Sequence, residues 1–242
     1  MEPSSRRDAI AAGLADVRHR LARSSERAGR ALASIRLVAI SKTHPIDDVR
    51  AAFAAGQVEF GENRLQEALE KIGLSSDMSI KWHLVGHLQS NKARKAAASF
   101  ACIHSIDDAD VLRRVDGAAA DIGRRPEAFV QIDLAGEPTK HGVTAEAWLS
   151  IFEAAATCRA VRVTGLMLLP PFTPDPEDAR PYFRRLRDLR DELAGRGVPP
   201  AMLRELSMGM SHDFEVAVEE GATLVRVGTA IFGGRTPPAR PL

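Results

Sequence analysis

The chain of 242 residues has few cysteines, few aromatic residues and no excess of charge of either sign. Its two cysteines, Cys102 and Cys158, lie in apolar stretches, which argues against a disulfide-stabilised scaffold and favours a reducing compartment. Lys and Arg total 33 against 32 Asp and Glu. This balance gives no reason to expect nucleic acid or an anionic membrane as a partner.

Long apolar runs are also missing from the sequence. No segment approaches the roughly 20 consecutive apolar residues that a membrane-spanning helix needs. Arg6 and Arg7 resemble the start of a twin-arginine export signal, but charged residues interrupt the apolar stretch that such a signal requires. We therefore expect a soluble, cytoplasmic protein.

What the chain does contain is a regular alternation of helical and strand-like patterns. Apolar residues make up 45% of it, enough for a sizeable core. Ile10, Leu14, Val17 and Leu21 recur at helical spacing and predict an amphipathic helix within residues 1–30. Eight short apolar segments follow, and each is predicted to be a strand: 35–42, 58–61, 82–86, 101–106, 128–134, 162–168, 203–207 and 223–227.

Strands that alternate with helices require right-handed parallel crossovers. Eight of them in a chain of this length predict an α/β fold, a (β/α)₈ barrel of the TIM type with an additional N-terminal helix. An open doubly wound sheet is the alternative. We expect one domain over residues 1–242, with a loose tail at 236–242.

Polar residues follow several of the predicted strands, where a barrel of this type carries its functional groups. Lys42 ends the first strand, and Asn63 follows the second. Ser207 ends the seventh strand, and residues 226–229 end the eighth. These residues are the candidates for a ligand site.

Lys42 follows the apolar segment Leu-Val-Ala-Ile-Ser, so its stem emerges from a buried strand. A solvated surface lysine is the simpler interpretation. In a partly dry pocket, by contrast, an amine has a lowered pKa and can attack a carbonyl to form an imine. Lys42 alone leaves both interpretations open.

Two glycine-containing loops favour a phosphate ligand. Residues 207–211 (Ser-Met-Gly-Met-Ser) and 227–234 (Val-Gly-Thr-Ala-Ile-Phe-Gly-Gly) each join a strand to a helix start. Glycine allows the backbone to approach a ligand, while N–H groups and the hydroxyls of Ser211 and Thr229 can donate to an anion. A helix cap at Ser211 and a plain turn at Gly228 are the alternative for either loop alone. Together, the seventh and eighth loops form a recurrent phosphate site of such barrels.

Arg226 places a charge inside an apolar strand, and a buried arginine is rare unless it is paired. It precedes the predicted phosphate loop by two residues and could meet a ring nitrogen or, alternatively, an acidic partner in a structural ion pair. His83 and His87 bracket Leu-Val-Gly, but no Cys, His or Asp cluster completes a zinc site. No metal is therefore predicted.

Six segments, in this order, are similar to those of a known family: Val-Ala-Ile-Ser-Lys42, Phe60-Gly-Glu-Asn63, Trp82-His-Leu-Val-Gly86-His-Leu-Gln89, Gly165-Leu-Met167, Leu206-Ser-Met-Gly-Met-Ser211 and Val225-Arg-Val-Gly-Thr-Ala-Ile-Phe-Gly233. Over residues 35–234 the chain resembles the pyridoxal phosphate homeostasis protein family. Members of that family are single-domain relatives of the N-terminal barrel of alanine racemase.

The resemblance implies a fold type III barrel that holds pyridoxal 5′-phosphate (PLP) as a Schiff base on Lys42. It implies that Arg226 faces the pyridine nitrogen and that Asn63 lies beside the ring. It further assigns residues to the phosphate and to the pocket wall: Ser207, Ser211, Gly228 and Thr229 to the phosphate, His83 and Met167 to the wall. Arg64 stands where many relatives carry tyrosine, and His212 varies in the family.

The resemblance also implies a protein that holds or delivers PLP and influences vitamin B6 and amino-acid balance. A racemase needs two bases, and in alanine racemase the second is a tyrosine from a separate domain. The only tyrosine here, Tyr182, lies in a predicted outer helix. We therefore expect no robust catalysis, a monomer, and transient contacts with PLP-dependent apo-enzymes. A low-activity PLP-dependent amino-acid racemase and a Schiff-base aldolase or isomerase for a sugar phosphate stay open as alternatives.

Overall fold

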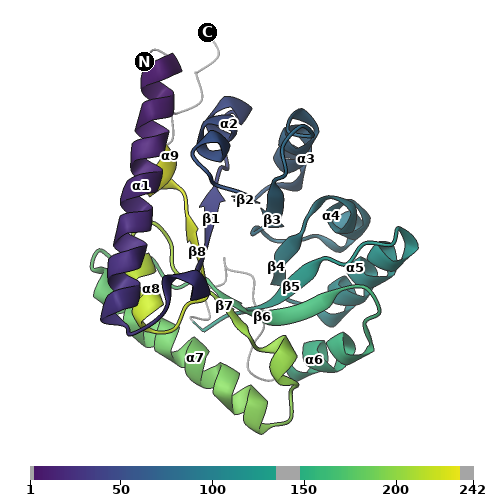
Figure 1. Cartoon of the computed structure of the whole chain (residues 1–242). Helices are drawn as coiled ribbons and strands as arrows, with labels where there is room; N and C mark the ends of the chain where they lie inside the picture. The colour runs from purple at the N-terminus through teal and green to yellow at the C-terminus, as the bar shows by residue number, and fades with distance from the viewer. Residues whose placement is uncertain (1–2, 135–147, 235–242) are drawn as a thin grey trace.

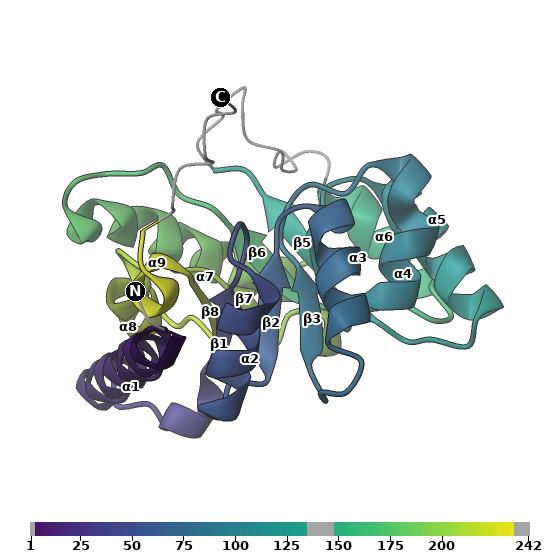
Figure 2. The same ribbon diagram turned by 90° about the horizontal axis from the view of Figure 1, so that it is seen from above.

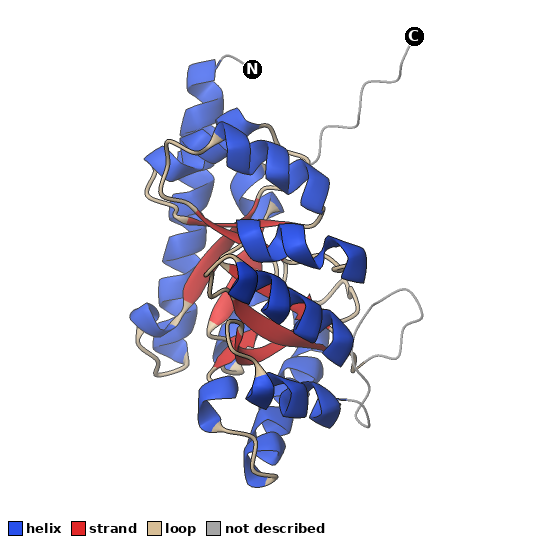
Figure 3. Cartoon of the chain, turned by 90° about the vertical axis from the view of Figure 1, so that its right-hand side faces the viewer, coloured by secondary structure: helices blue, strands red, loops and turns tan. Residues whose placement is uncertain are grey.

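The fold is known from a computed structural model, which describes residues 3–134 and 148–234. The predicted tail at 236–242 lies outside the described residues. Within them, the chain alternates strands and helices from end to end, with helices outside and strands inside (Figure 3).

Eight parallel strands form a closed barrel in chain order, which confirms the predicted fold class. Every predicted strand is present within a few residues of its expected bounds. The strands are β1 (Arg36–Ile40), β2 (Glu59–Glu62), β3 (Lys81–Leu84), β4 (Cys102–Ile106), β5 (Glu127–Ile132), β6 (Arg162–Leu168), β7 (Glu205–Ser207) and β8 (Leu224–Val227). Each is short and almost continuously buried, as expected of parallel strands covered by helices.

The pairing of β8 with β1 closes the barrel and decides which loops are neighbours. Val38 lies opposite Arg226, and Ala39 lies opposite Val227. Because all strands are parallel, their carboxyl ends lie at one end of the barrel. The loops after β7, β8, β1 and β2 therefore follow four consecutive strands.

Helices cover the outside of the barrel, as the view from above in Figure 2 shows. The α-helices are α1 (Pro3–Arg27), α2 (Ile46–Ala54), α3 (Leu65–Leu74), α4 (Ala93–Ser99), α5 (Ala109–Asp121), α6 (Trp148–Thr157), α7 (Arg180–Gly195), α8 (Phe214–Glu219) and α9 (Thr229–Phe232). Short 3₁₀ turns are η1 (Leu32–Ser34), η2 (Ser90–Lys92), η3 (Pro176–Ala179) and η4 (Pro200–Met202). Among the residues described, no helix is both long and apolar enough to cross a membrane.

The N-terminal helix α1 lies along the outside of the barrel, beside α8 and α9, so it joins the two ends of the chain (Figure 1). Its predicted apolar stripe is confirmed, since Ile10, Leu14, Val17 and Leu21 are all buried. Gly29, with a φ of 64°, turns the chain just after the helix ends at Arg27.

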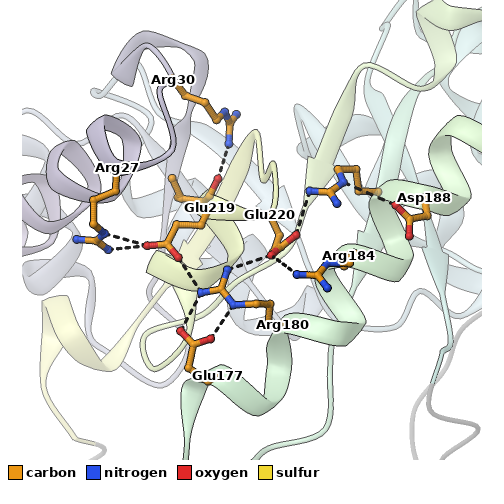
Figure 4. A network of polar contacts seen from close by, with 10 residues as sticks. Arg27, Arg30, Glu177, Arg180, Arg184, Asp188, Glu219 and Glu220 are labelled. Carbon is orange, nitrogen blue, oxygen red and sulfur yellow. Dashed lines mark hydrogen bonds and ion pairs between the residues drawn. The ribbon is translucent and has the colours of Figure 1, made fainter.

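Ion pairs fasten α1 to the helices around it (Figure 4). Arg27 pairs with Glu219 at 2.8 Å, and Arg180 pairs with Glu219 at 2.7 Å and with Glu220 at 3.0 Å. Arg187 also pairs with Glu220, again at 3.0 Å. The end of α8 thus connects α1 with α7.

The inside of the barrel is mixed in character. An apolar layer is formed by Val38, Ile40, Val85, Cys102, Phe129, Met167 and Leu224. The polar side chains buried in this interior include His83, His104, Ser207 and Arg226. Buried polar groups must find partners within the protein, and these four bond to one another.

Candidate functional site

Lys42 lies in the loop after β1, two residues beyond the end of the strand, and its side chain is half-buried. The residues on either side of it are held in unusual ways. Ser41 is fully buried, and Thr43 has a φ of 67°, a left-handed conformation that a β-branched residue rarely adopts. Such strain persists only where neighbouring groups hold it in place.

Two glutamates and a lysine hold the loop that carries Lys42. Ser41 donates its hydroxyl to Glu62 at 2.6 Å, and the backbone N–H of Thr43 donates to Glu67 at 2.6 Å. The ammonium of Lys71 joins both carboxylates at 2.7 Å and also donates to the Ser41 carbonyl. Burial raises the pKa of Glu62 in spite of these donors. The cluster fixes the backbone on both sides of Lys42.

The loops after β7 and β8 meet at Ser211. Its hydroxyl oxygen accepts from the backbone N–H of Gly228 at 3.1 Å and of Ala230 at 3.3 Å. Gly209 has a φ of 92°, and a Cβ there would lie 2.6 Å from Ala217, so this turn requires glycine. The predicted phosphate residues Ser211 and Gly228 are therefore in direct contact, and Thr229 is exposed beside them.

Arg226 extends across the carboxyl end of the barrel interior. One of its terminal nitrogens, Nη1, donates to Ser207 Oγ at 2.5 Å, and the other, Nη2, donates to the Leu168 carbonyl at 2.8 Å. Burial lowers the pKa of Arg226 to about 10. No ion pair holds Arg226 among the described residues, so the predicted alternative of a structural pair is not what is observed there.

A row of hydrogen bonds continues from Arg226 into the barrel. Ser207 Oγ lies 2.9 Å from His104 Nδ1, and His104 Nε2 lies 2.9 Å from His83 Nδ1. Arginine can only donate, so Ser207 Oγ accepts from Arg226. A Glu59 carboxylate oxygen lies beside His83 Nε2 and favours a proton on that nitrogen, so His83 Nδ1 accepts from His104 Nε2, and His104 Nδ1 accepts from the Ser207 hydroxyl. Burial lowers the pKa of both histidines and so favours their neutral forms.

The row ends at Glu59, the first residue of β2. His83 Nε2 lies 3.4 Å from a Glu59 oxygen, and Arg36 pairs with the same oxygen at 3.1 Å. Burial alone would raise the pKa of Glu59, but the contacts with His83 and Arg36 outweigh it and lower the pKa to about 2. A cation at one end and an anion at the other therefore polarise the row in one direction.

The remaining predicted site residues lie in different surroundings. Asn63 directly follows β2 with an exposed side chain. A Cβ at Gly86 would lie 2.0 Å from the Asn63 carbonyl oxygen, so glycine is needed for this close approach. Met167 is part of the apolar layer inside the barrel. His83 is joined to Ser207 only through His104, and it faces the opposite end of the barrel from Lys42.

One premise of the metal prediction was wrong. No cluster of metal-ligating residues was expected, yet the ligand atoms of His83, Cys102 and His104 lie within 4.8 Å of one another. Burial raises the pKa of the Cys102 thiol and lowers that of His104, so the thiol keeps its proton. A thiol must be deprotonated to ligate a metal, and the absence of a metal stays a prediction.

Sequence reasoning missed His104 and the cluster behind Lys42. His104 had a local signal, because Cys102, His104 and Ile106 alternate along one face of a strand. A histidine two residues from the apolar inward position of Cys102 indicates a buried polar contact. Glu62, Glu67 and Lys71 had a weaker signal, since Glu67 and Lys71 are spaced for a helical ion pair. Nothing local connects that pair with Lys42.

Comparisons with known proteins agree with this geometry. The family model described as alanine racemase, N-terminal domain, matches residues 13–236. The pyridoxal phosphate homeostasis protein of Aquifex aeolicus is 41% identical over 92% of this chain and 96% of its own length. The protein of that name from Pseudomonas aeruginosa is 40% identical over 93% of this chain and 96% of its own length.

Solved structures give the same result. PipY of Synechococcus elongatus with PLP bound has a TM-score of 0.82 and 38% identity, covering 93% of this chain and 100% of its own. Alanine racemase from Corynebacterium glutamicum, 19% identical with a TM-score of 0.69, covers 98% of this chain and 64% of its own, and supports the fold alone. Given the matched length and identity, this chain belongs to the pyridoxal phosphate homeostasis protein family, whose barrel is that of the alanine racemase N-terminal domain.

Proposed function

We propose that this chain binds PLP at the carboxyl end of its barrel, covalently on Lys42, and serves PLP and amino-acid homeostasis. One observation carries the proposal: three neighbouring strands, β1, β8 and β7, bring these residues to one end of the barrel. Lys42 follows β1, Arg226 lies near the end of β8, and Ser211 and Gly228, which follow β7 and β8, bond to each other. The family to which the chain belongs, and the PLP bound to its relative PipY, support the same cofactor.

The donors at this end of the barrel fit the three polar parts of PLP. An amine, Lys42, suits the aldehyde, and a guanidinium, Arg226, suits a ring nitrogen that accepts a hydrogen bond. The turn of Ser211, Gly228, Thr229 and Ala230 suits the phosphate, since the N–H groups of Gly228 and Ala230 now donate to Ser211 Oγ at 3.1 and 3.3 Å and could donate to a phosphate oxygen in its place. Ser207 supports this set by holding Arg226, and Asn63 and Met167 complete the proposed surroundings of the ring.

PLP, when bound, supplies an aldehyde for an amine and a ring that withdraws electrons, most strongly when its nitrogen is protonated. Arg226 has no acceptor and therefore cannot stabilise a proton on that nitrogen. It is also held by Ser207 and the Leu168 carbonyl, so it cannot rotate away without losing both bonds. The chain's own residues thus favour a weakly activated cofactor. His83 contributes to this arrangement only through His104.

The position of Tyr182 supports a protein that holds PLP rather than one that uses PLP in catalysis. It lies in α7 and packs partly against the outer core. A general base must reach the proton that it removes, and α7 covers the outside of the barrel (Figure 1). We therefore propose a PLP carrier without robust catalysis, active in the cytoplasm as a monomer, with transient contacts to PLP-dependent apo-enzymes.

Borohydride reduction of the PLP-loaded protein followed by peptide mass analysis tests the anchor. We expect the reduced adduct on Lys42, none in Lys42→Ala, and an unchanged yield in the control Lys95→Ala, because Lys95 is exposed on α4. An adduct on another lysine would overturn the assignment. A colourless protein that takes up no PLP would instead favour the sugar-phosphate aldolase or isomerase.

The racemase alternative has a separate test. The PLP-loaded protein is incubated with L-amino acids in deuterium oxide, and exchange of the α-proton is followed by NMR. A carrier is expected to give no exchange above that of free PLP with Lys42→Ala. Exchange that depends on Lys42 would show that the protein is an enzyme.

A further inference from the structure

A cavity of about 520 Å³ lies at the opposite end of the barrel from Lys42. Its lining includes the first residues of six strands, β1 to β6. Because the strands are parallel, their first residues mark the amino end of the barrel. The cavity is therefore separate from the proposed PLP site.

The cavity has more positive than negative charge. Five cationic side chains line it, namely Arg36, Lys81, Arg124, Arg125 and Arg162. Only two carboxylates do so, Glu59 and Glu127, which leaves an excess of three positive charges. An ion-pair layer with a purely structural role would be close to balance.

The two carboxylates are already engaged by other cations. Glu59 pairs with Arg36 at 3.1 Å, and Glu127 pairs with Arg162 at 3.3 Å. No carboxylate of the described chain lies within 4.0 Å of Arg124 or Arg125, and both side chains are exposed. Arg124 makes one long hydrogen bond, of 3.5 Å, to the Phe100 carbonyl, so both guanidinium groups are available to an anion from solution.

The floor of the cavity presents a buried donor. His83 lines the cavity with 0% exposure, and its Nε2 makes no hydrogen bond among the residues described. A Glu59 carboxylate oxygen, 3.4 Å from this nitrogen, favours a proton on it but is too far for a good hydrogen bond. A buried N–H with so long a contact is poorly satisfied, so a hydrogen-bond acceptor in the cavity would complete it.

We infer that this cavity binds a small multivalent oxyanion, a polycarboxylate or a phosphate compound, with Arg124 and Arg125 at its rim and His83 at its floor. Guanidinium groups suit both ligand chemistries because they donate to two oxygens at once. A metal cation does not fit, since five cationic side chains would repel it. The inference does not require the proposed function, because its ligand contacts lie at the amino end of the barrel and His83 reaches the cofactor end only through His104 and Ser207.

Calorimetric titration of the full chain tests the inference, with citrate and inorganic pyrophosphate as the two probes. The protein is loaded with PLP first, so that phosphate cannot bind at the cofactor end. We expect saturable binding of one probe per chain, weakened about tenfold or more in the double variant Arg124→Gln, Arg125→Gln. The preferred probe identifies the ligand as a carboxylate or a phosphate compound.

The double variant Arg113→Gln, Arg114→Gln is the matched control. It removes the same charge from exposed positions on α5, outside the cavity lining, and should bind the probe as the wild type does. Equal weakening in both double variants would mean nonspecific attraction and would overturn the inference, as would no binding of either probe. Loss of binding in Ser211→Ala would place the anion at the other end of the barrel and would overturn it too.

Discussion

Lys42 is positioned by residues that do not themselves face a ligand. Its two neighbours in the chain are bonded to Glu62 and Glu67, and Lys71 joins both carboxylates. The left-handed Thr43 shows that this loop is held against its own preference. The position of Lys42 after β1 therefore depends on Glu67 and Lys71 of α3, the helix that follows β2.

Lys71→Met should remove this support. Glu62 would keep a buried charge without its cation, so we expect the free energy of unfolding to fall by about 3 kcal/mol. PLP affinity should fall as well, because the loop of Lys42 loses its anchor. Urea denaturation and PLP titration measure the two effects. In the control Lys95→Met, at an exposed position, stability should change by less than about 0.5 kcal/mol; a similar loss there would contradict the explanation.

The two histidines inside the barrel should each be the tautomer that carries its proton on Nε2. The reason is that the Glu59 carboxylate favours a proton on His83 Nε2, which sets the direction of the bonds from Ser207 to His104 and from His104 to His83. Nitrogen chemical shifts from NMR distinguish the tautomers directly. A proton on Nδ1 of His104 would show that the Ser207 hydroxyl points elsewhere.

Stability should fall on mild acidification because of the same histidines. Burial lowers the pKa of His83 and His104. Below the ordinary histidine pKa of about 6.5, the unfolded chain then binds more protons than the folded one. Each histidine therefore lowers the free energy of unfolding by up to about 1.4 kcal/mol per pH unit. The loss begins as the pH falls below that value and continues towards the lowered pKa of the folded state.

Comparison with His104→Gln isolates one histidine. Buried carboxyls with raised pKa, such as Glu62 and Asp213, act in the opposite direction, but they are present in both proteins. The free energy of unfolding, measured at about pH 7 and about pH 5.5, should therefore depend less on pH in the variant than in the wild type. Equal pH dependence in the two proteins would indicate that His104 is not held neutral.

At the scale of elements, the two ends of the described chain are tied together by α1. This helix packs on α8 and α9, and the ion pairs around Glu219 and Glu220 extend the contact to α7 (Figure 4). A barrel closed by β1 and β8 depends on that region, since the pairing of these strands joins the start of the barrel to its end.

Glu220→Gln should weaken this connection. Glu220 is 5% exposed and pairs with Arg180, Arg184 and Arg187. Removing the charge should cost roughly 1.5–3 kcal/mol of unfolding free energy, since charge-assisted bonds are lost. Thermal unfolding measures the loss, with Glu192→Gln as control, because the Arg185–Glu192 pair is exposed on α7. Equal losses in the two variants would argue against a special role for the network.

The elements themselves were largely predictable, because each strand is a short apolar segment and each helix has its own period. The residues at which the strands end were harder to predict. The first strand was predicted to reach Lys42 but ends at Ile40. The Ser41 N–H still donates to the Gly61 carbonyl of β2 at 3.1 Å, and the chain then turns at Thr43, whose φ is 67°. The fifth was predicted to reach Leu134 and ends at Ile132. In both cases the strand-like sequence pattern continues beyond the last residue that the structure assigns to the strand.

For the whole molecule, barrel closure explains which parts of the site could be predicted. The candidates after β1, β2, β7 and β8 are neighbours by topology, so the rule for barrel loops was enough to collect them. The bond between His104 and His83 depends on the register between β3 and β4 and on which side chains fit inside the barrel. That information is not local in the sequence. For this reason the candidate residues at the carboxyl end could be named in advance, and the polar interior could not.

The row of polar contacts from Arg226 to Glu59 gives the barrel interior a fixed electrostatic polarity, with a cation at one end and an anion at the other. Its direction is set at both ends, because a guanidinium can only donate and a carboxylate can only accept. The two ends of the row are therefore chemically unlike: an arginine stands towards the cofactor end, and a carboxylate flanked by cationic side chains stands at the amino end. A charge added or removed at Glu59 should consequently be felt at Arg226, across the full depth of the fold.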